Sequence, residues 1–487
     1  MLMQAKRLHP AALLYFWYQS LKSGLLYFFI LLAFNFNERF TGYFWLALFA
    51  VLLPTVVGGI LKYLRYSYEL AAQEIILHSG VIFPKHLHIS YAKIQTLQTK
   101  QWFYLRPFGL LSLQIETSSQ AADEPEAVLP VISRAVVTQI QAKRDAVLKN
   151  DRQTEIFFPD RDSETEHIPA SSEFSYQIKG HDLNLYALTS LGFLPLMLGF
   201  LAIYNRLSDV IPQKYINAAV KTLENRSGVV LSLLAIVVIL LALGFSYLVV
   251  INRYFHFEVH PEEKQLVTSK GLLQQNIVTA SQEKIQAVVI SQSFLRQALK
   301  LATVQLVLAS QAADEEQDDQ LVLLPVLSQG LALKNASRLV KWLPQKIPRL
   351  PVGRRFERWK IIRNILLPTI LLVVIIGLFF QPYGWLSVVL LPVAFWIGYY
   401  ASVNNRLALT NADVLLAQNG HLLTRKLYLI PRGRIQAMSM QQTVLMARVE
   451  LSHLKIILRS GNEKQVVQVR YLPKKKAEEI YRWYRHK

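Results

Sequence analysis

Six apolar segments, grouped in three pairs, dominate the pattern of hydrophobic and polar positions. A helix needs about 20 mostly apolar residues to cross a bilayer, and each segment is close to that length. The segments cover residues 12–34, 43–64, 183–204, 229–251, 361–380 and 385–403. The pattern therefore predicts a multipass membrane protein with six transmembrane α-helices in three hairpins, over residues 12–64, 183–251 and 361–403.

The first apolar segment also fits the start of a cleavable signal peptide, because Lys6 and Arg7 precede it. No cleavage site of small residues follows its apolar core, and the other segments come in pairs. We therefore expect the first segment to be retained as one half of a hairpin.

The three stretches that follow the hairpins show the alternation of polar and apolar residues that is typical of half-buried β-strands. They cover residues 65–150, 252–343 and 404–487. Each ends in an amphipathic helical segment, which in the last stretch places Ala477, Ile480, Tyr481 and Tyr484 on one face. Each stretch is thus predicted to form a small β-barrel of six or seven strands with a C-terminal α-helix. Residues 151–180 and 344–360 are predicted to be a polar and a basic linker.

The three stretches repeat one another at fixed spacings. Gly80, Gly271 and Gly420 correspond, and an Ile-Gln pair follows them after 14, 14 and 15 residues. These pairs are Ile94-Gln95, Ile285-Gln286 and Ile435-Gln436. The sequence SQAADE occurs twice, at an offset of 191 residues that also separates Gly80 from Gly271. The chain is therefore interpreted as a triplicated unit.

Two further repeat positions predict local structure. We expect the three glycines to lie in turns between strands, where a positive φ is needed. A Leu-Pro pair near the end of each unit is expected to open the C-terminal helix, since proline is favourable in the first turn. These pairs are Leu129-Pro130, Leu324-Pro325 and Leu472-Pro473.

The composition narrows the class of protein. Only 18% of the residues are charged, and the formal net charge is +20, which favours an anionic neighbour such as a membrane surface or nucleic acid. No motif for reading nucleic acid accompanies the basic C-terminal helix, so we expect membrane lipids and no nucleic acid as partners. The absence of cysteine excludes disulfides, thiol nucleophiles and zinc-thiolate sites.

Basic residues near the ends of the segments predict the orientation. They gather on the side of the termini and of the long polar stretches, although the connection 205–228 is also basic. We therefore expect the inner bacterial membrane, with both termini and all three barrels in the cytoplasm. Arg354, Arg355, Arg358 and Lys360 form a basic run that is a candidate for anionic-lipid contacts, at about 1 kcal/mol each. The alternative is that this run only sets the topology.

Catalytic and metal-binding patterns are weak. His86 and His88 share one strand face, but the other repeats lack such a pair, and the acidic run at 314–319 lacks the glycine and spacing of a calcium loop. Phosphate-loop, nucleophile-elbow and zinc-helix motifs are absent from the sequence. No catalytic residue, metal or cofactor is therefore predicted.

Two spans, a glycine turn, a basic residue before Ile-Gln, a hairpin and a helix together resemble the bacterial pleckstrin-homology-like membrane family. The basic residues are Lys93, Lys284 and Arg434. Three such units in one chain are similar to the YdbT-like members, although the third unit has one extra residue before Ile435. The resemblance implies a PH-like barrel, a cell-membrane location and no enzymatic activity. Some relatives are linked to protection against membrane-active peptides such as bacteriocins.

Three functions remain open at this point. The first is a non-catalytic, membrane-anchored scaffold that binds a protein, peptide or lipid and supports envelope protection, with a smaller PH-like membrane protein as a further partner. The second is a transporter or lipid-moving protein whose spans form a path. The third is an integral membrane enzyme.

Overall fold

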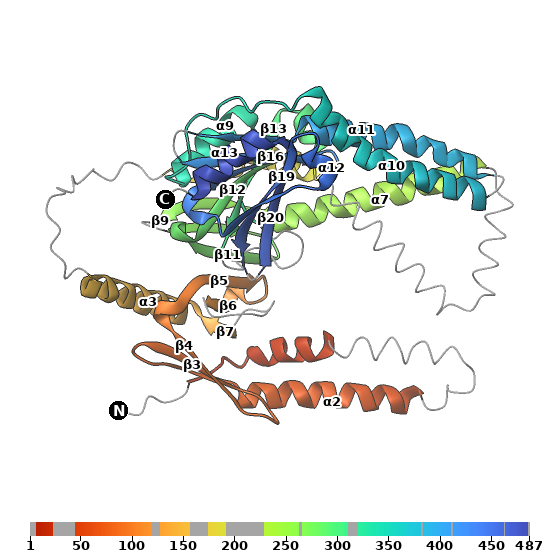
Figure 1. Ribbon diagram of the computed structural model, residues 1–487. Helices are drawn as coiled ribbons and strands as arrows, with labels where there is room; N and C mark the ends of the chain where they lie inside the picture. Colours follow the sequence, from red (N-terminus) through yellow and green to blue (C-terminus); the bar gives the residue numbers. More distant parts are fainter. Residues whose placement is uncertain are drawn as a thin grey trace.

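A computed structural model describes residues 6–22, 44–117, 127–155, 174–190, 228–262, 265–309, 320–380, 383–410, 413–461 and 463–485. Each repeat forms a sandwich of two small antiparallel sheets, with six strands of its own and a C-terminal helix (Figure 1). The first unit contains β2 (Ser67–Leu70), β3 (Glu74–Ser79), β4 (Lys85–Ser90), β5 (Ile94–Trp102), β6 (Leu110–Thr117), β7 (Ala127–Ser133) and α3 (Arg134–Glu155).

The second and third units repeat this order of elements. The second contains β9 (Glu258–Glu262), β10 (Gln265–Lys270), β11 (Gln274–Ser281), β12 (Ile285–Gln292), β13 (Leu301–Leu308), β14 (Leu321–Ser328) and α9 (Gln329–Leu339). The third contains β15 (Arg406–Leu409), β16 (Val414–His421), β17 (Thr424–Pro431), β18 (Ala437–Gln441), β19 (Leu451–Ser460), β20 (Glu463–Pro473) and α13 (Lys474–Arg485). The triplicated unit and its C-terminal helix are confirmed.

Short helical turns also recur at equivalent places. One turn precedes the second sheet of each unit: η2 (Tyr91–Lys93), η4 (Gln282–Lys284) and η6 (Arg432–Arg434). Another turn follows the first strand of that second sheet: η3 (Arg106–Phe108), α8 (Phe294–Ala298) and α12 (Val444–Ala447). Two short strands extend the sheets of the first two units: β1 (Lys6–Arg7) pairs with β2, and β8 (Tyr176–Gln177) pairs with β9. In both units the chain therefore leaves a sheet before its hairpin and returns to the same sheet after it.

Neighbouring units share continuous sheets. β5 of the first unit pairs with β11 of the second, and β12 of the second pairs with β17 of the third. The resulting sheets have the orders β7-β6-β5-β11-β10-β9-β8 and β14-β13-β12-β17-β16-β15. Each unit thus joins the next by strand pairing, which the repeat pattern of the sequence does not predict.

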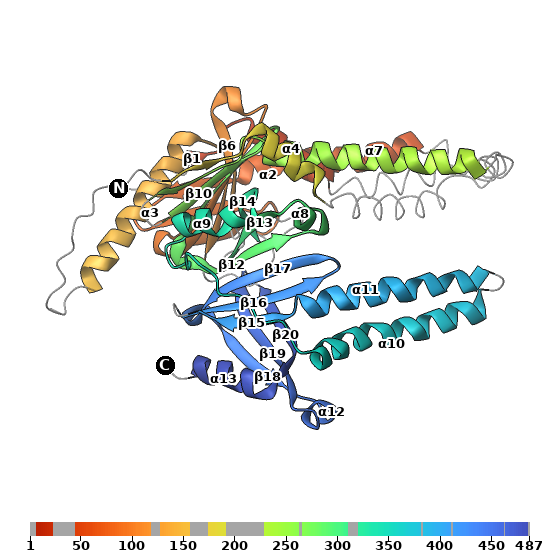
Figure 2. The same ribbon diagram turned by 90° about the horizontal axis from the view of Figure 1, so that it is seen from above.

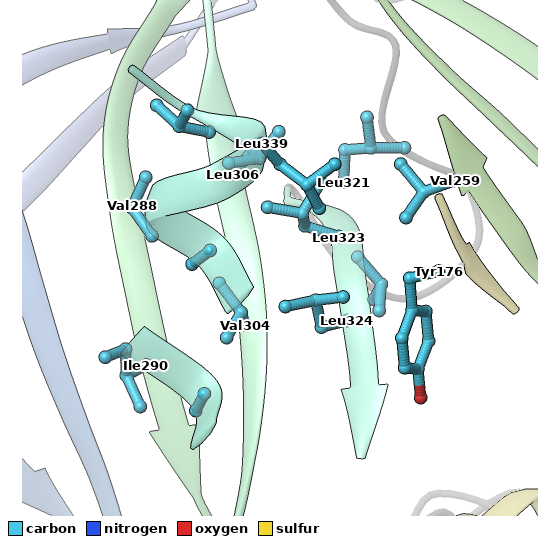
Figure 3. Packing of buried hydrophobic residues seen from close by; sticks show 14 of the residues in the cluster. Tyr176, Val259, Val288, Ile290, Val304, Leu306, Leu321, Leu323, Leu324 and Leu339 are labelled. Atoms are coloured by element: carbon cyan, nitrogen blue, oxygen red, sulfur yellow. The ribbon is translucent and has the colours of Figure 1, made fainter. Parts of the chain in front are cut away.

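Strand β12 lies between two hydrophobic cores, which explains why its sequence is apolar on both faces. Val288 and Ile290 point into the core of the second unit, where Figure 3 shows them with Val304, Leu306 and Leu324. Ala287 and Val289 are fully buried in the core of the third unit. Burying one such aliphatic side chain contributes about 1.5–3 kcal/mol, so β12 stabilises two units at once.

The described residues contain three helices that are long and apolar enough to cross a membrane, rather than the six that were predicted: Ile236–Tyr254, Arg355–Phe379 and Tyr383–Val403. The first is part of α7 (Gly228–Tyr254), the second is α10, and the third combines η5 (Tyr383–Val389) with α11 (Leu390–Val403). The second predicted segment is also helical, as α2 (Phe44–Arg65). Residues 12–22 of the first predicted segment are described and helical, whereas its remainder and most of the third predicted segment lie outside the described residues.

The start of the third predicted segment has a structural role of its own. Leu183 lies within α4 (Gly180–Leu188), a short helix whose Leu183 and Tyr186 are buried in the core of the second unit. α2, α7, α10 and α11 extend from one side of the sandwiches (Figure 2). The three candidate spans therefore leave the sandwiches in the same direction.

The repeat glycines do not all serve the same purpose. Gly80 and Gly271 have φ of +93° and +115°, as a glycine turn requires. Gly420 lies inside β16, and the turn that follows places Leu422 and Leu423 at positive φ instead. A Cβ on Gly420 would lie 2.9 Å from Cβ of Asn404, so close packing against the end of α11 requires this glycine. With the extra residue in the third unit, the left-handed backbone conformation thus falls on the two leucines after the glycine rather than on the glycine itself.

The Ile-Gln and Leu-Pro pairs also have structural explanations. Ile94, Ile285 and Ile435 are buried where the second sheet begins. Leu129-Pro130 and Leu324-Pro325 lie inside β7 and β14, so the prediction that they open a helix is wrong. Both prolines lie where the pairing to the neighbouring strand shifts, and proline is tolerated at such bulges of edge strands. Only Leu472-Pro473 ends directly before its helix.

Candidate functional site: a basic cleft at the membrane boundary

A cleft of about 750 Å³ lies where the third sandwich meets its two membrane helices. Its apolar wall comes from α10 and α11, and its polar wall comes from β16, β17 and β20. Seventeen residues line it: Ile361, Asn364, Ile365, Ile397, Ala401, Asn405, Asn419, Gly420, His421, Leu422, Thr424, Lys426, Tyr428, Val466, Gln468, Arg470 and Tyr471. None of these residues is acidic, so the cleft is suited to an anion.

The position of the apolar wall follows from the sequence of α10. Arg363 is the last ionizable residue of this helix, and Ile365 begins a run in which Thr369 is the only polar residue. At about 1.5 Å per residue, Ile365 lies about 15 Å from the start of the helix at Arg355. The cleft therefore opens at the depth where the helix passes from polar to apolar surroundings.

Paired backbone and side-chain hydrogen bonds hold the polar wall to the end of α11. The side-chain amide of Asn405 donates to the carbonyl oxygen of Arg470 at 2.7 Å, and the N–H of Arg470 donates to Oδ1 of Asn405 at 3.0 Å. Nε of Arg470 donates to Gln468 at 3.3 Å. These bonds fix β20 next to the helix and keep the guanidinium of Arg470, an exposed residue, at the cleft.

Tyr471 follows Arg470 in a left-handed conformation, with φ of +51°. Its N–H donates to Nδ1 of His453 at 3.0 Å, and the two rings meet edge to face at 4.6 Å. Burial lowers the pKa of His453, and the positive charge of Arg470 lowers it further. A neutral imidazole that accepts the hydrogen bond therefore stabilises this unusual backbone at the cleft.

A second, smaller cavity of about 140 Å³ lies next to the basic linker. Arg354, Arg358, Arg406 and Lys476 line it, together with one carboxylate, Glu357. Oε2 of the buried Glu357 accepts the N–H of Arg354 at 2.9 Å, which closes the first turn of α10. Four cations against one carboxylate leave this cavity positive as well.

Burial makes the charged forms of several cations in the small cavity less favourable. Burial lowers the pKa of Lys476, against the opposing effects of Glu357 and Glu479, and its Nζ donates to the carbonyl oxygen of Leu407 at 2.8 Å. Burial and the nearby Arg425 lower the pKa of Arg406. Nε of Arg358 is buried without a hydrogen-bond partner in the described part of the chain. An anion in this cavity would compensate such groups.

The predicted lipid-contact residues divide between two environments. Arg354 and Arg358 line the small cavity, whereas Arg355 is exposed at the start of α10. Nζ of Lys360 lies 4.9 Å from the ring of Phe356 rather than in either cavity. The sequence reasoning missed Lys426 and Arg470 of the larger cleft. A comparison of the repeats carries one signal, because Arg425-Lys426 stand where the second unit has Gln275-Asn276.

The remaining predicted positions have local roles. Gln286 is buried and donates to the carbonyl oxygen of Lys284, and Gln436 is exposed. His86 lies beside His78, with 2.6 Å between their Nδ1 atoms. Within the described ranges no three His, Cys, Asp or Glu side chains converge as a metal site would require.

Fold and cleft together define a membrane-anchored protein built from three PH-like sandwiches. The family model described as "Bacterial PH domain" matches residues 26–146, 215–346 and 364–487, so the chain belongs to the bacterial PH domain family. It is also similar to the UPF0699 transmembrane protein YdbT of Bacillus subtilis (strain 168), with 26% identity over 99% of both chains. These findings confirm the predicted family and the three repeats. PH-like domains are typically binding domains rather than catalysts.

Proposed function

We propose that this protein is a non-catalytic membrane scaffold whose third unit binds the headgroup of an anionic phospholipid. The observation that carries the proposal is the basic cleft, in which Lys426 and Arg470 line the same space as the apolar Ile365 of α10 and Ile397 of α11, without an acidic residue in the lining. A phosphate would contact the cations, while acyl chains would follow the wall formed by Ile365 and Ile397.

The experiment compares bound lipid in matched variants. Wild-type protein and the double variant Lys426→Gln/Arg470→Gln are reconstituted into nanodiscs of phosphatidylglycerol and phosphatidylcholine, and co-purifying lipid is measured by mass spectrometry after detergent extraction. Charge-assisted hydrogen bonds contribute about 1.5–3 kcal/mol each when buried and less in an open cleft, so we expect a loss of retained phosphatidylglycerol of about tenfold.

Lys464→Gln is the matched control, because Lys464 lies exposed on β20 outside the cleft lining. It should retain lipid like the wild type. Equal retention by the double variant, or retention of phosphatidylcholine alone, would contradict the lipid proposal. The basic run is tested in the same assay. Arg354→Gln/Arg358→Gln should reduce the retained phosphatidylglycerol, because both residues line the smaller cavity, whereas Arg355→Gln lies outside that lining and should retain lipid nearly like the wild type.

We place the three sandwiches in the cytoplasm, with both termini, on the inner bacterial membrane. Basic residues lie where the helices meet the sandwiches, including Lys62 and Arg65 of α2, Arg253 of α7 and Arg355 of α10. Cytoplasmic flanks of spans are enriched in such residues. Because the chain has no cysteine, Lys464→Cys offers a unique label, and an impermeant maleimide should react with it only after the cells are opened.

A role in envelope protection against membrane-active peptides is the physiological part of the proposal. It rests on the family resemblance and on the lipid-facing cleft. A deletion strain should be more sensitive than its parent to a panel of bacteriocin-type peptides, and unchanged sensitivity across the panel would count against this role. A smaller PH-like membrane protein as a partner would be sought by affinity purification from native membranes.

The alternative of a transporter or lipid-moving protein requires a path between the spans. In the described parts of α7, α10 and α11, ionizable side chains lie only toward the ends next to the sandwiches. The described parts of these helices therefore do not favour a transporter over the scaffold. Substrate flux measured in liposomes would support the transporter instead.

A further inference from the structure

The two junctions between units use the same strand register. Leu97 pairs with Thr279 and Lys100 with Asn276 in the first junction. At the second junction Val288 pairs with Leu429 and Ser291 with Lys426. The Ile-Gln positions relate the units by offsets of 191 and 150 residues, and with these offsets both junctions pair the same repeat positions. One rule therefore joins a strand of the β5 type to a strand of the β4 type in the next unit.

Among the described strands, this rule leaves one strand of each type without a partner from another unit. β4 is the edge of the first unit's sheet, and β18 is the edge of the third unit's sheet. β4 corresponds to β11 and β17, while β18 corresponds to β5 and β12. The two edges at the ends of the chain of units are therefore complementary to each other.

Side-chain exposure at equivalent positions shows what the missing neighbour would cover. Ala287 on β12 is fully buried, whereas the equivalent Ala437 on β18 is exposed. Val444 and Leu445 of α12 are 76% and 71% exposed, against 51% and 40% for their counterparts in α8. At the other end, Ile82 is 81% exposed and its counterpart Leu273 is 50% exposed. These positions are less exposed wherever a neighbouring unit pairs with the adjacent strand.

The open edges also lack the usual protection. Free edges are commonly blunted by charged residues or proline. β18 reads Ala-Met-Ser-Met-Gln, with neither, and in β4 only the first residue, Lys85, has a fixed charge. Both strands thus retain the backbone donors and acceptors that a further antiparallel strand would use.

The membrane decides which kind of strand can pair with β18. β11 begins next to the end of α7, as the bond from Leu273 N–H to Oδ1 of Asn252 shows, and Thr424 at the start of β17 lines the cleft beside α10 and α11. Both strands therefore run away from the membrane helices. β5 runs toward them, because Phe103 at its end bonds to Leu273. Two β18 strands in one membrane would have the same direction relative to the helices, which disfavours an antiparallel pair between them. Both observed junctions pair a strand of the β5 type with one of the β4 type, which makes a β4-type strand the expected partner of β18.

We propose that β18 of one copy of this chain pairs antiparallel with β4 of a second copy, which continues the row of sandwiches from molecule to molecule along the membrane. The shared register assigns the pairs as Ala437↔Ile89, Met438↔His88, Ser439↔Leu87, Met440↔His86 and Gln441↔Lys85. α12 then faces the turn at residues 81–83 of the second copy. A contact of this head-to-tail kind closes into a ring or extends as a row.

Cysteine cross-linking tests the register, because the chain has no cysteine of its own. Differently tagged chains with Lys85→Cys or Gln441→Cys are co-expressed and oxidised in native membranes. We expect a disulfide-linked species that contains both tags. Directly opposed strand residues have Cβ atoms about 4.5–5.5 Å apart, close enough for a disulfide after small adjustments.

Two controls make the result decisive. Lys100→Cys/Asn276→Cys places the same register pair within one chain, and its internal disulfide shows that this geometry cross-links. His88→Cys with Gln441→Cys is three residues out of register and should cross-link at least tenfold less. Failure of the Lys85–Gln441 link while the internal control forms would overturn the proposal. So would a Gln441–Gln441 link, or a link from Gln441 only to a different protein.

Discussion

The two junctions between units have the same backbone register but different side-chain chemistry. The junction of β12 and β17 has an apolar centre, where Val289 is fully buried. The equivalent position at the junction of β5 and β11 is Gln98, which is buried, as is the neighbouring Thr96 on the same strand face. Strand pairing therefore sets the geometry of both junctions, while the side chains decide how strongly the units are coupled.

This difference leads to different cores. The apolar junction lets Val414 and Leu416 of the third unit join the core of the second. The core of the first unit stays separate from that of the second. We infer that the second and third units unfold together, and that the first unit can separate from them at lower cost. Substitutions at equivalent positions of the two junctions test this difference in coupling.

The largest effect is expected from Val289→Asp, which places an unpaired charge in the shared core. Buried charges without a partner are among the substitutions that cost more than about 4 kcal/mol, so little folded protein should be recovered. Gln98→Asp should cost about 2 kcal/mol, because a polar side chain is already accommodated there. Ser439→Asp at the open edge should stay within about 0.5 kcal/mol.

Thermal unfolding in detergent, followed by size-exclusion chromatography with fluorescence detection, measures this order. Equal losses for Val289→Asp and Gln98→Asp would contradict the proposed difference between the junctions. Ser439→Asp has a second readout, since it should reduce the cross-link between copies while leaving monomer stability unchanged.

The next largest loss of stability is expected from substitution of the glycines that correspond between repeats. Gly271→Ala forces a side chain into φ of +115° and places its Cβ 1.9 Å from the carbonyl oxygen of Gln274. We expect a loss of at least about 2 kcal/mol in the free energy of unfolding. Gly420→Ala has ordinary backbone and meets Asn404 at 2.9 Å, so about 1 kcal/mol is expected.

Gly330→Ala is the control for these two variants. Nothing lies within 4 Å of a Cβ at Gly330, which is in the first turn of α9. It should leave stability unchanged or raise it by up to about 1 kcal/mol. An order in which Gly420→Ala costs more than Gly271→Ala would show that close packing at the helix end matters more than the left-handed turn.

The smallest effect concerns pH. The lowered pKa of His453 means that the unfolded chain takes up a proton, as pH falls below the ordinary value of 6.5, before the folded chain does. Stability should therefore fall between pH 6.5 and the lowered folded pKa, and level off below it. Because the group is half-buried and makes one hydrogen bond, we expect a loss of less than about 1 kcal/mol.

His453→Asn checks this assignment, because the amide oxygen can accept the Tyr471 N–H without titrating. The variant should lose the dependence on pH in this window, measured as the shift in melting temperature between pH 7 and pH 5. His421→Asn changes an exposed histidine and should keep it. If both variants keep the dependence, another group is responsible.

Much of the fold was predictable because periodicity and repeats report on local structure. The alternation of apolar residues predicted the strands, the common spacing from Gly to Ile-Gln predicted three equal units, and the stripe through Ala477 and Ile480 predicted the C-terminal helix. The role of Leu129-Pro130 was not predictable, since a proline at an edge-strand bulge and one at a helix start look alike in sequence. The cleft was missed because Ile365, Lys426 and Arg470 are far apart along the chain.

The amino-acid sequence alone was enough to predict the three repeated units and three of the six expected membrane helices, because these depend on hydropathy and on contacts between neighbours in the chain. Only the tertiary structure decided that the units share sheets, that β12 serves two cores, and that β4 and β18 are left open. Pairing between edge strands uses backbone groups, which are the same in every residue except proline. The choice of partner strand therefore leaves little trace in the sequence and appears only when the units are seen side by side.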